Sequence, residues 1–505
     1  MANQYISKYL KTYVLQGIAV VLGFVSMFVV TPFISSDVVV FGVYSVCISL
    51  SIFFSYADLG IGSAGQKFAA EYFKLGKKDK EIGILGFVLF TYLVFMGLIS
   101  LAILFLAIDP DILIKNIAAD NIAIARSLLV TLALSSPIMA MQRTLTVVYN
   151  VRLEDYKFQR IVILGTVLKI LSVFWFFRDS VYDIVGYYIC FQLITLSVVV
   201  AGLSYAIKKY EIDFHLLILS IKPNRRVFTQ VRGLAGASLV SMICWVLYYE
   251  LDQIAIGALL GAKQVAIYAI AFSVLSLFRT FFSVLYSPYT SRLNYFTAEN
   301  DFDGLNRFVN NLIYLFYPVV VFPIIIVALC AEPFLLSWVG KAYEESALLC
   351  SILVCCNLFA YYVQPANAYL YVCKMNYKLI VSSMLTAFIY WIGIIVLYKV
   401  LDIVAFPIMK VVAIWANAFF VIIVMRKQVA QKGLISSLIK GYVPSTLVCC
   451  IFAMVVAEFM YKDKSTTNLL INVCVMGVVI IVSFTTLLLT NKSWRNISYS
   501  ILKCI

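Results

Sequence analysis

Charged side chains are scarce in this 505-residue chain. Only 13% of the residues are charged, while 63% are apolar or aromatic. A water-soluble domain carries about 25% charged residues, so a soluble fold of this length could not hide so much apolar surface. Lipid is therefore the expected solvent for most of the chain. In lipid the backbone has to satisfy its own hydrogen bonds, which leaves only helices and closed barrels.

The apolar stretches have the length of helical membrane spans. Strands of a membrane barrel alternate apolar and polar residues over about 10 positions, whereas this chain stays apolar for about 20 residues at a time. The first stretch begins near Thr12 and the last ends near Thr490. The sequence therefore predicts an all-α polytopic membrane protein with about fourteen transmembrane helices.

Histidine is nearly absent, which excludes several kinds of catalytic site. The chain has one histidine, His215, so catalytic Ser–His or Cys–His pairs and metal sites built from several histidines are not expected. The twelve cysteines lie mostly in apolar stretches without ligand spacing, and there is no phosphate loop or dinucleotide fingerprint. We expect no enzymatic activity, no cofactor and no metal site. Short outer loops disfavour a membrane glycosyltransferase or polysaccharide polymerase, which stays open as a less favoured alternative.

Lysine and arginine predict the orientation of the chain. Of the 39 basic residues, 26 fall on the side of the even-numbered connections and the two termini, seven on the other side and six within spans. Cytoplasmic loops are richer in Lys and Arg, so both termini are predicted to be cytoplasmic. The net charge of +14 is then explained by topology and by anionic membrane lipid, and nucleic acid is not an expected partner.

An internal repeat predicts how the helices are divided. Phe41–Val46 (FGVYSV) matches Val265–Ile270 (VAIYAI), and a serine follows each stretch three residues later. The two stretches lie six spans apart, which is typical of parallel six-helix halves. Two similar apolar helices remain the alternative explanation. The predicted division is an N-terminal lobe at 1–210, a cytoplasmic linker at 211–229, a C-terminal lobe at 230–427, and an appended helix pair with a cytoplasmic tail at 428–505.

Three basic residues lie deep inside predicted spans. Lys169, Arg279 and Lys410 are each about eight or more residues from either end of a span, too far for the charge to reach the headgroups cheaply. Guanidinium suits bidentate binding of phosphate, so these residues predict a cavity for an anionic substrate. The alternative is that they pair with acids near the span ends or with backbone carbonyls.

The acidic residues of the predicted spans lie near the ends of those spans. Glu250 and Asp252 come at the end of a predicted span from Gln230 to Leu251, so no deep carboxylate balances Arg279 or nominates an ion-coupling site. Four polar side chains are further candidates for lining the cavity, although each is equally explained as a hydrogen-bonding contact between helices. They are Arg143, Gln142, Asn357 and Asn367.

Several short motifs resemble one transporter family. Gln16–Pro32, Phe41–Tyr44 and Asp58–Ala64 look like the opening of the Wzx-type polysaccharide flippases, and Leu251–Ala271 is similar to the seventh-to-eighth span region of that family. The resemblance covers the first twelve spans, and the last pair matches the longer members. These flippases belong to the multidrug/oligosaccharidyl-lipid/polysaccharide exporter superfamily.

The resemblance implies a function in surface polysaccharide biosynthesis. The expected activity is translocation of an undecaprenyl-diphosphate-linked oligosaccharide, such as an O-antigen repeat unit, from the cytoplasmic to the outer leaflet of the bacterial inner membrane by alternating access. It implies that Arg279 holds the pyrophosphate, with Lys169 and Lys410 contributing to the cavity field. Implied partners are this glycan and membrane lipid, with a polysaccharide polymerase and a chain-length regulator as further candidates. A multidrug or cation exporter of the same superfamily is the main alternative.

Overall fold

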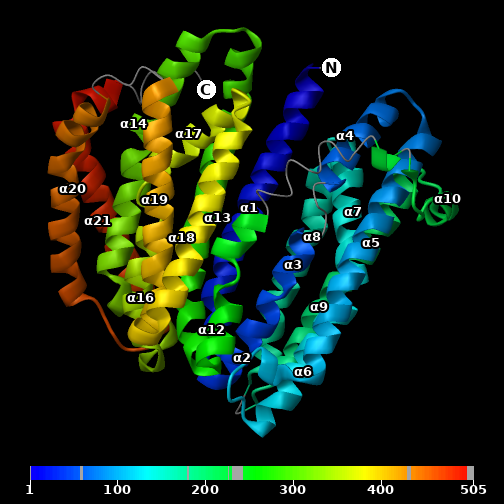
Figure 1. Ribbon diagram of the computed structural model, residues 1–505, viewed down its shortest axis with the longest axis horizontal. Helices are drawn as coiled ribbons and strands as arrows, with labels where there is room; N and C mark the ends of the chain where they lie inside the picture. Colours follow the sequence, from blue (N-terminus) through cyan, green and yellow to red (C-terminus); the bar gives the residue numbers. More distant parts are fainter. Residues whose placement is uncertain are drawn as a thin grey trace. The chain divides into compact units, whose positions relative to one another are not determined.

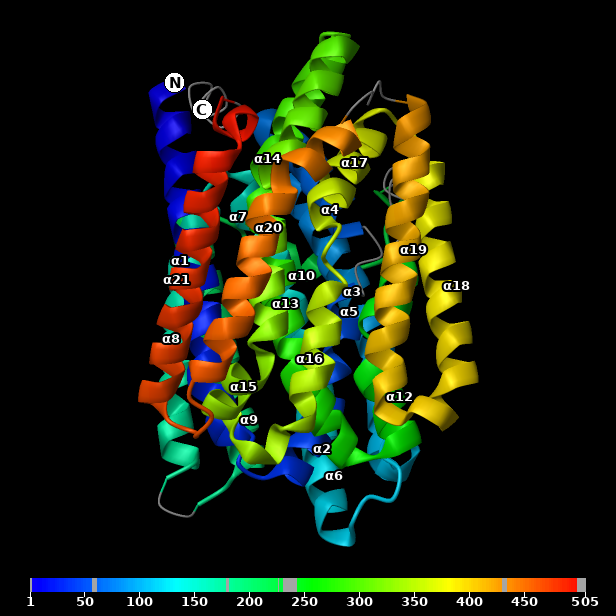
Figure 2. The ribbon, with the colours of Figure 1, turned by 90° about the vertical axis from the view of Figure 1, so that its left-hand side faces the viewer.

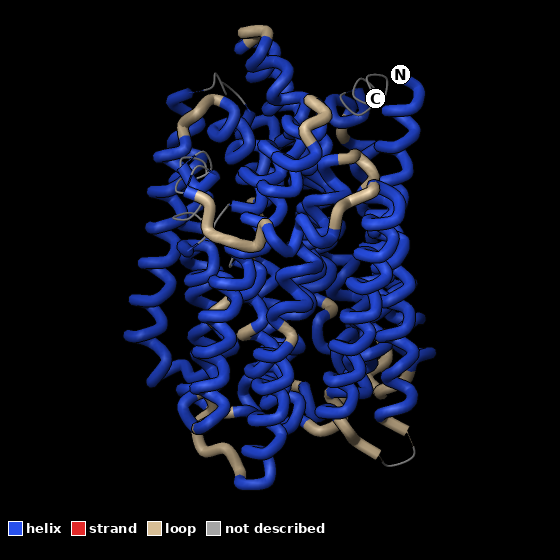
Figure 3. The backbone as a smooth tube through the Cα atoms, turned by 90° about the vertical axis from the view of Figure 1, so that its right-hand side faces the viewer, coloured by secondary structure: helices blue, strands red, loops and turns tan. Residues whose placement is uncertain are grey.

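The chain folds into helices in the computed structural model (Figure 1). The structure describes residues 2–56, 61–178, 181–225, 227–229, 243–428 and 434–496. All regular secondary structure in this part of the chain is helical, and Figure 3 draws no strand there. The prediction of an all-α polytopic membrane fold is confirmed.

Residue contacts divide the chain into two compact units. Unit 1 comprises Met1–Val246 and Glu250–Ala266, and unit 2 comprises Leu247–Tyr249 and Ile267–Ile505. The helices of unit 1 are α1 (Ala2–Ile34), α2 (Val38–Ser49), α3 (Ser51–Tyr56), α4 (Ile61–Lys74), α5 (Lys78–Ile108), α6 (Ala119–Leu134), α7 (Ser136–Val151), α8 (Asp155–Phe176), α9 (Ile184–Tyr210), α10 (Phe214–Leu219) and α12 (Asp252–Leu260). The helices of unit 2, where α13 starts in the last residues of unit 1, are α13 (Ala262–Ala298), α14 (Phe302–Leu329), α15 (Ala331–Val339), α16 (Glu345–Cys355), α17 (Ala360–Val372), α18 (Asn376–Leu401), α19 (Ala405–Gln428), α20 (Leu434–Phe459) and α21 (Thr466–Thr490).

The helices match the predicted spans in number. The described residues contain 11 helices that are long and apolar enough to cross a membrane, or up to 13 when each of two bent pairs is one span. The 51-residue stretch Asn376–Arg426, which counts once in those totals, contains the two packed helices α18 and α19. Each of the fourteen predicted spans therefore has a helical counterpart. The predicted boundaries of the two lobes, the linker and the appended pair stay a prediction.

Aspartates fix where several of these helices begin. The Asp37 carboxylate accepts hydrogen bonds from the backbone N–H groups of Val39 and Val40, both at 3.0 Å, at the start of α2. Asp183 does the same for α9, accepting from Gly186 N at 2.7 Å. The first N–H groups of a helix lack partners within it, so a carboxylate there satisfies them and favours the helix dipole.

The predicted end of the seventh span lies at a break between two helical segments. The first segment, Ile243–Tyr249, ends two residues before Leu251, and the chain then continues as α12 to Leu260 with a bend of 46° between the two. The predicted start at Gln230 lies outside the described residues. Glu250 and Asp252 consequently lie at this bend. Asp252 is in the first turn of α12, where an acid stabilises the N-terminus of the helix.

The last two helices are fastened into unit 2 by buried amides. In α21 the Asn472 side chain, fully buried, donates to Pro333 O at 3.2 Å and to Ser337 Oγ at 3.0 Å on α15. Tyr314 of α14 donates its hydroxyl hydrogen to Asn491 Oδ1 at 3.0 Å. Figure 2 shows α20 and α21 running side by side. Because each buried amide is satisfied, these contacts tie the predicted appended pair to α14 and α15.

Candidate functional site

Lys410 is buried inside unit 2. It lies on α19 with 1% of its surface exposed. Its ammonium donates a hydrogen bond to the backbone oxygen of Tyr249 at 3.2 Å. The same Nζ lies 5.0, 5.1 and 5.5 Å from the ring centroids of Tyr249, Phe272 and Tyr390, within the range of cation–π attraction. A carbonyl and three aromatic rings therefore hold this charge in place.

Arg279 approaches the same tyrosine. The residue is half-buried on α13, and its guanidinium carbon lies 5.1 Å from the Tyr249 ring centroid. The structure thus brings together two of the three predicted deep cations on one ring within unit 2. We call Arg279, Tyr249 and Lys410 the tyrosine–cation cluster.

The bend after Tyr249 explains why its carbonyl group is available to Lys410. The helical segment Ile243–Tyr249 ends at the bend, so its last carbonyl groups have no N–H partner within the helix. Lys410 caps the Tyr249 carbonyl, and Trp391 Nε1 of α18 donates to the Leu247 carbonyl at 2.9 Å. A cation at this negative end of the helix is also favoured by its dipole.

Lys169, the third predicted cation, belongs to unit 1. It is half-buried on α8, and its Nζ lies 3.7 Å from the ring centroid of Phe191 on α9. Arg279 and Lys410 belong to unit 2. The suggested contribution of Lys169 to a common cavity stays a prediction.

The four predicted lining residues have different surroundings. Arg143 is exposed and Gln142 half-buried on α7, in unit 1. In unit 2, Asn357 lies in the break between α16 and α17, and Asn367 lies on α17. The buried Asn357 Nδ2 and Asn367 Oδ1 atoms have no hydrogen-bond partner among the described residues. Buried amide atoms of this kind call for water or a ligand, so these two asparagines suit a wet cavity.

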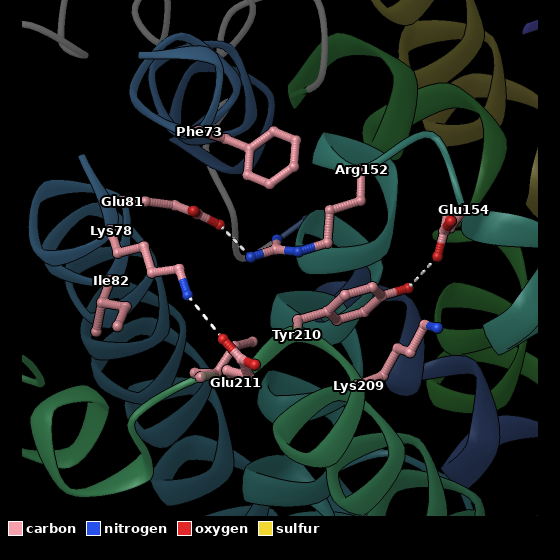
Figure 4. A pocket seen from close by; sticks show the side chains of 10 residues that line it. Phe73, Lys78, Glu81, Ile82, Arg152, Glu154, Lys209, Tyr210 and Glu211 are labelled. Atoms are coloured by element: carbon pink, nitrogen blue, oxygen red, sulfur yellow. Dashed lines mark hydrogen bonds and ion pairs between the residues drawn. The ribbon is translucent and has the colours of Figure 1, made fainter. Parts of the chain in front are cut away.

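A pocket in unit 1, lined by charged, aromatic and aliphatic side chains, was not predicted. It measures about 380 Å³ and is lined by Phe73, Lys78, Glu81, Ile82, Arg152, Glu154, Lys209, Tyr210, Glu211 and Ile212 (Figure 4). We call it the Arg152 pocket. The chain segments that line it are the C-terminal ends of α4 and α9, the start of α5, and the connections that follow α7 and α9. The sequence signal was available, because glutamates alternate with the basic residues in these connections.

The Arg152 guanidinium forms the floor of this pocket. It pairs with Glu81 at 2.6 Å, and its carbon lies 4.9 Å from the Phe73 ring centroid and 4.7 Å from that of Tyr210. Both members of the ion pair are buried, with side chains 8% and 3% exposed. Figure 4 shows the guanidinium aimed at Glu81, with the Phe73 and Tyr210 rings on either side of it. Arginine suits such a site because its planar cation stacks on rings and binds carboxylate at once.

Metal ligands do not gather in the described part of the chain. No group of three or more His, Cys, Asp or Glu side chains there is placed to hold a metal ion. The chemistry that both sites offer is ionic and aromatic: anion binding by arginine and lysine, and stacking on tyrosine and phenylalanine.

Comparisons with known proteins address the fold. Residues 237–404 match the MatE family model. A search of curated proteins finds no significant match. Among solved structures, the lipid II flippase MurJ in an inward closed conformation matches with a TM-score of 0.67 at 13% identity, covering 95% of this chain and 98% of the flippase.

Two further solved structures have the same fold. An inward-facing multidrug resistance transporter of the MATE family matches with a TM-score of 0.63 at 15% identity, over 82% of this chain and 95% of that transporter. A transporter of the MOP superfamily from Pyrococcus furiosus, described as having a binding pocket of reverse polarity that suggests a different function, matches with a TM-score of 0.55 at 16% identity, over 86% and 96%. At such identities the likeness concerns the fold. The chain is a multi-pass membrane protein with the fold of MOP superfamily transporters and flippases, and it contains a region that matches the MatE family.

Proposed function

We propose that this protein is a flippase for a lipid-linked oligosaccharide. Its substrate is an undecaprenyl-diphosphate-linked repeat unit for surface polysaccharide, moved from the cytoplasmic to the outer leaflet of the bacterial inner membrane by alternating access of the lobes 1–210 and 230–427. The observation that carries the proposal is the tyrosine–cation cluster, in which the side chains of Arg279 and Lys410 both lie against the Tyr249 ring within unit 2. A cationic interior favours an anionic diphosphate.

The members of the cluster have different roles in this proposal. Arg279 is half-buried, and in this proposal its guanidinium binds the diphosphate. Lys410 has 1% of its surface exposed and already donates to the Tyr249 carbonyl, so it supports the positive field and holds Tyr249 in position. Lys169 adds to the field from the N-terminal lobe. Asn357 and Asn367 offer buried amide atoms to water or to sugar hydroxyl groups.

The solved relatives support the kind of substrate rather than its identity. One structure with the same fold is a lipid II flippase, whose name refers to a lipid-linked substrate. The Pyrococcus furiosus transporter is described with a pocket of reverse polarity, which indicates that pocket charge varies among proteins of this fold. In the proposed pathway both termini are cytoplasmic, and a polysaccharide polymerase and a chain-length regulator act on the exported glycan.

A cation exporter is the second candidate function. The MatE match and the fold shared with MATE multidrug transporters favour it, and so do Glu250 and Asp252, which lie at the bend between Tyr249 and α12. An exporter of cationic compounds would use these carboxylates to bind its substrate. The flippase is preferred because the tyrosine–cation cluster borders the same bend.

Substitution of Arg279 tests the proposal. In a strain that depends on this protein for surface glycan, Arg279→Ala is expected to reduce the glycan at least about tenfold, because a charge-assisted hydrogen bond contributes about 1.5–3 kcal/mol. Arg279→Lys is expected to retain part of the activity, since it keeps the charge but loses the bidentate geometry. Glycan is measured at matched protein levels.

Arg126 provides the matched control. It is an arginine near the end of a span that donates to the carbonyls of Ala107 and Ile108 at 3.1 and 3.2 Å. Arg126→Ala removes an arginine whose guanidinium is bound to backbone carbonyls within the protein, so glycan export per folded protein should persist. Normal glycan with Arg279→Ala, or loss of cation export with normal glycan, would overturn the flippase proposal.

A further inference from the structure

The Arg152 pocket lies where membrane spans of unit 1 begin and end. Lys78 and Glu81 belong to the first turn of α5, Arg152 follows the last residue of α7, and Tyr210 is the last residue of α9. All three helices are candidate spans or parts of one. The ends of spans lie at the depth of the lipid headgroups, so the pocket is level with them. The distribution of Lys and Arg predicts that this is the cytoplasmic leaflet.

The two charges at the floor of the pocket are paired with each other. Arg152 pairs with the buried Glu81 at 2.6 Å and donates through NH1 to the Val148 carbonyl at 3.0 Å. Both rings beside it, Phe73 and Tyr210, face its guanidinium. A buried ion pair is costly to break, so these groups form a rigid base and do not turn toward a ligand.

The mouth of the pocket has charges that can exchange partners. Lys78 and Glu211 pair at 3.1 Å, but their side chains are 63% and 81% exposed. An exposed ion pair contributes little stability, so either member can take another partner at small cost. Lys209 is exposed and has no ion-pair partner in the described part of the chain, and Figure 4 draws no interaction from it. The mouth thus offers two ammonium groups and one carboxylate.

The backbone is strained on two sides of this mouth. Leu153 has a φ of 54° and Glu211 a φ of 51°, both in the left-handed region that residues other than glycine rarely adopt. Leu153 directly precedes Glu154, which accepts a hydrogen bond from the Tyr210 hydroxyl at 2.9 Å. Strain of this kind is concentrated at functional sites. Here it sets the positions of two carboxylates that line the pocket.

We propose that the Arg152 pocket binds the phosphoethanolamine headgroup of a phospholipid in the cytoplasmic leaflet. The phosphate contacts the ammonium groups of Lys209 and Lys78, and the ethanolamine ammonium donates to the Glu211 carboxylate. The zwitterion replaces the Lys78–Glu211 pair with no change in net charge. The volume of about 380 Å³ is within the range of small-ligand sites.

The chemistry of the pocket discriminates among headgroups. A purely anionic headgroup would place its charge beside Glu211 with no cation of its own to offset that carboxylate. A choline group has no N–H to donate and is recognised by open aromatic faces, whereas Phe73 and Tyr210 are taken by Arg152. The amine phospholipid meets both requirements. This inference is independent of the substrate that the protein transports.

Lipid retention by the full chain tests the inference. The protein is reconstituted in nanodiscs with equal amounts of phosphatidylethanolamine, phosphatidylglycerol and phosphatidylcholine, extracted in mild detergent, and the lipid that remains bound is quantified. The wild-type chain is expected to enrich phosphatidylethanolamine. Lys209→Gln and Glu211→Gln should each lower this enrichment about tenfold, because each removes one charge-assisted contact. Lys80→Gln, a lysine on α5 that does not line the pocket, is the matched control and should leave it unchanged.

A soluble probe identifies the source of the headgroup. O-phosphoethanolamine is expected to displace the retained lipid from the wild-type chain. Equal retention of phosphatidylglycerol, or enrichment that persists in both Gln variants, would overturn the inference. Binding of O-phosphoethanolamine without retention of the diacyl lipid would also overturn it, because the ligand would then be a soluble zwitterion.

Discussion

The Arg152 pocket and the tyrosine–cation cluster use the same materials in opposite ways. Each combines a basic side chain with aromatic rings. At the end of the spans in unit 1, Arg152 is neutralised by Glu81 and covered by two rings, so the charge is consumed within the protein. In unit 2, Lys410 lies against three rings and a carbonyl, and Arg279 lies against one of those rings. An ion pair neutralises a cation, whereas a ring or a carbonyl stabilises a cation and leaves its charge.

The largest expected effect concerns the buried pair of unit 1. Arg152→Met leaves Glu81 buried without its partner, so the free energy of unfolding in detergent should fall by about 3–5 kcal/mol. Replacing both residues by methionine should recover most of the loss, because no uncompensated charge remains. A double variant as unstable as the single one would mean that the ion pair does not explain the effect.

Substitution of Lys410 should give the next largest effect, both on the free energy of unfolding and on glycan export. Lys410→Met leaves the Tyr249 carbonyl buried without its donor, which is expected to lower the free energy of unfolding by about 1–3 kcal/mol. Glycan export per folded protein should also fall, since Tyr249 then no longer aligns Arg279. Lys399→Met, an exposed lysine at the end of α18, is the control. Unchanged stability of Lys410→Met would refute its proposed capping role.

Lys169 should show the smallest effect on stability. Its visible contact is one ring, at 3.7 Å, and the residue is half-buried, so Lys169→Met is expected to cost about 0.5–1 kcal/mol. Glycan export should nevertheless decrease if the charge contributes to the substrate field. Phe191→Leu keeps the charge and removes the ring, so export should persist. If both variants reduced export equally, the contact and not the charge would be what matters.

The span boundaries show how far a pattern of hydropathy reaches. Each of the fourteen predicted spans has a helical counterpart, but the pattern did not show that a second helix, α12, follows the seventh span after a bend. In the folded chain Asp252 is completely buried at the start of α12. Burial of this carboxylate could not be predicted, because an acid beside an apolar stretch looks like the exposed end of a span in a linear sequence.

Only some residues of the candidate sites could be predicted, because a linear pattern shows depth within a span but not contacts between spans. Depth within a span selected Lys169, Arg279 and Lys410, since a cation that cannot reach the headgroups is conspicuous in any sequence. Tyr249 was not distinguished from other tyrosines near a span end, because its importance comes from lying beside residues 30 and 161 positions away. The Arg152 pocket was missed because its residues come from four separate segments, and each segment alone looks like an ordinary basic connection.

Hydropathy was enough to predict a helical membrane protein with about fourteen spans, because in lipid every long apolar stretch has to satisfy its own backbone hydrogen bonds and a helix does so. Depth within a span was enough to single out three cations that cannot reach the headgroups cheaply. Which charges meet depends on packing: Arg279 and Lys410 share Tyr249, and Arg152 is neutralised by Glu81. Electrostatic and aromatic contacts act over a few ångströms, and packing and helix bends bring residues within that range whatever their distance along the chain.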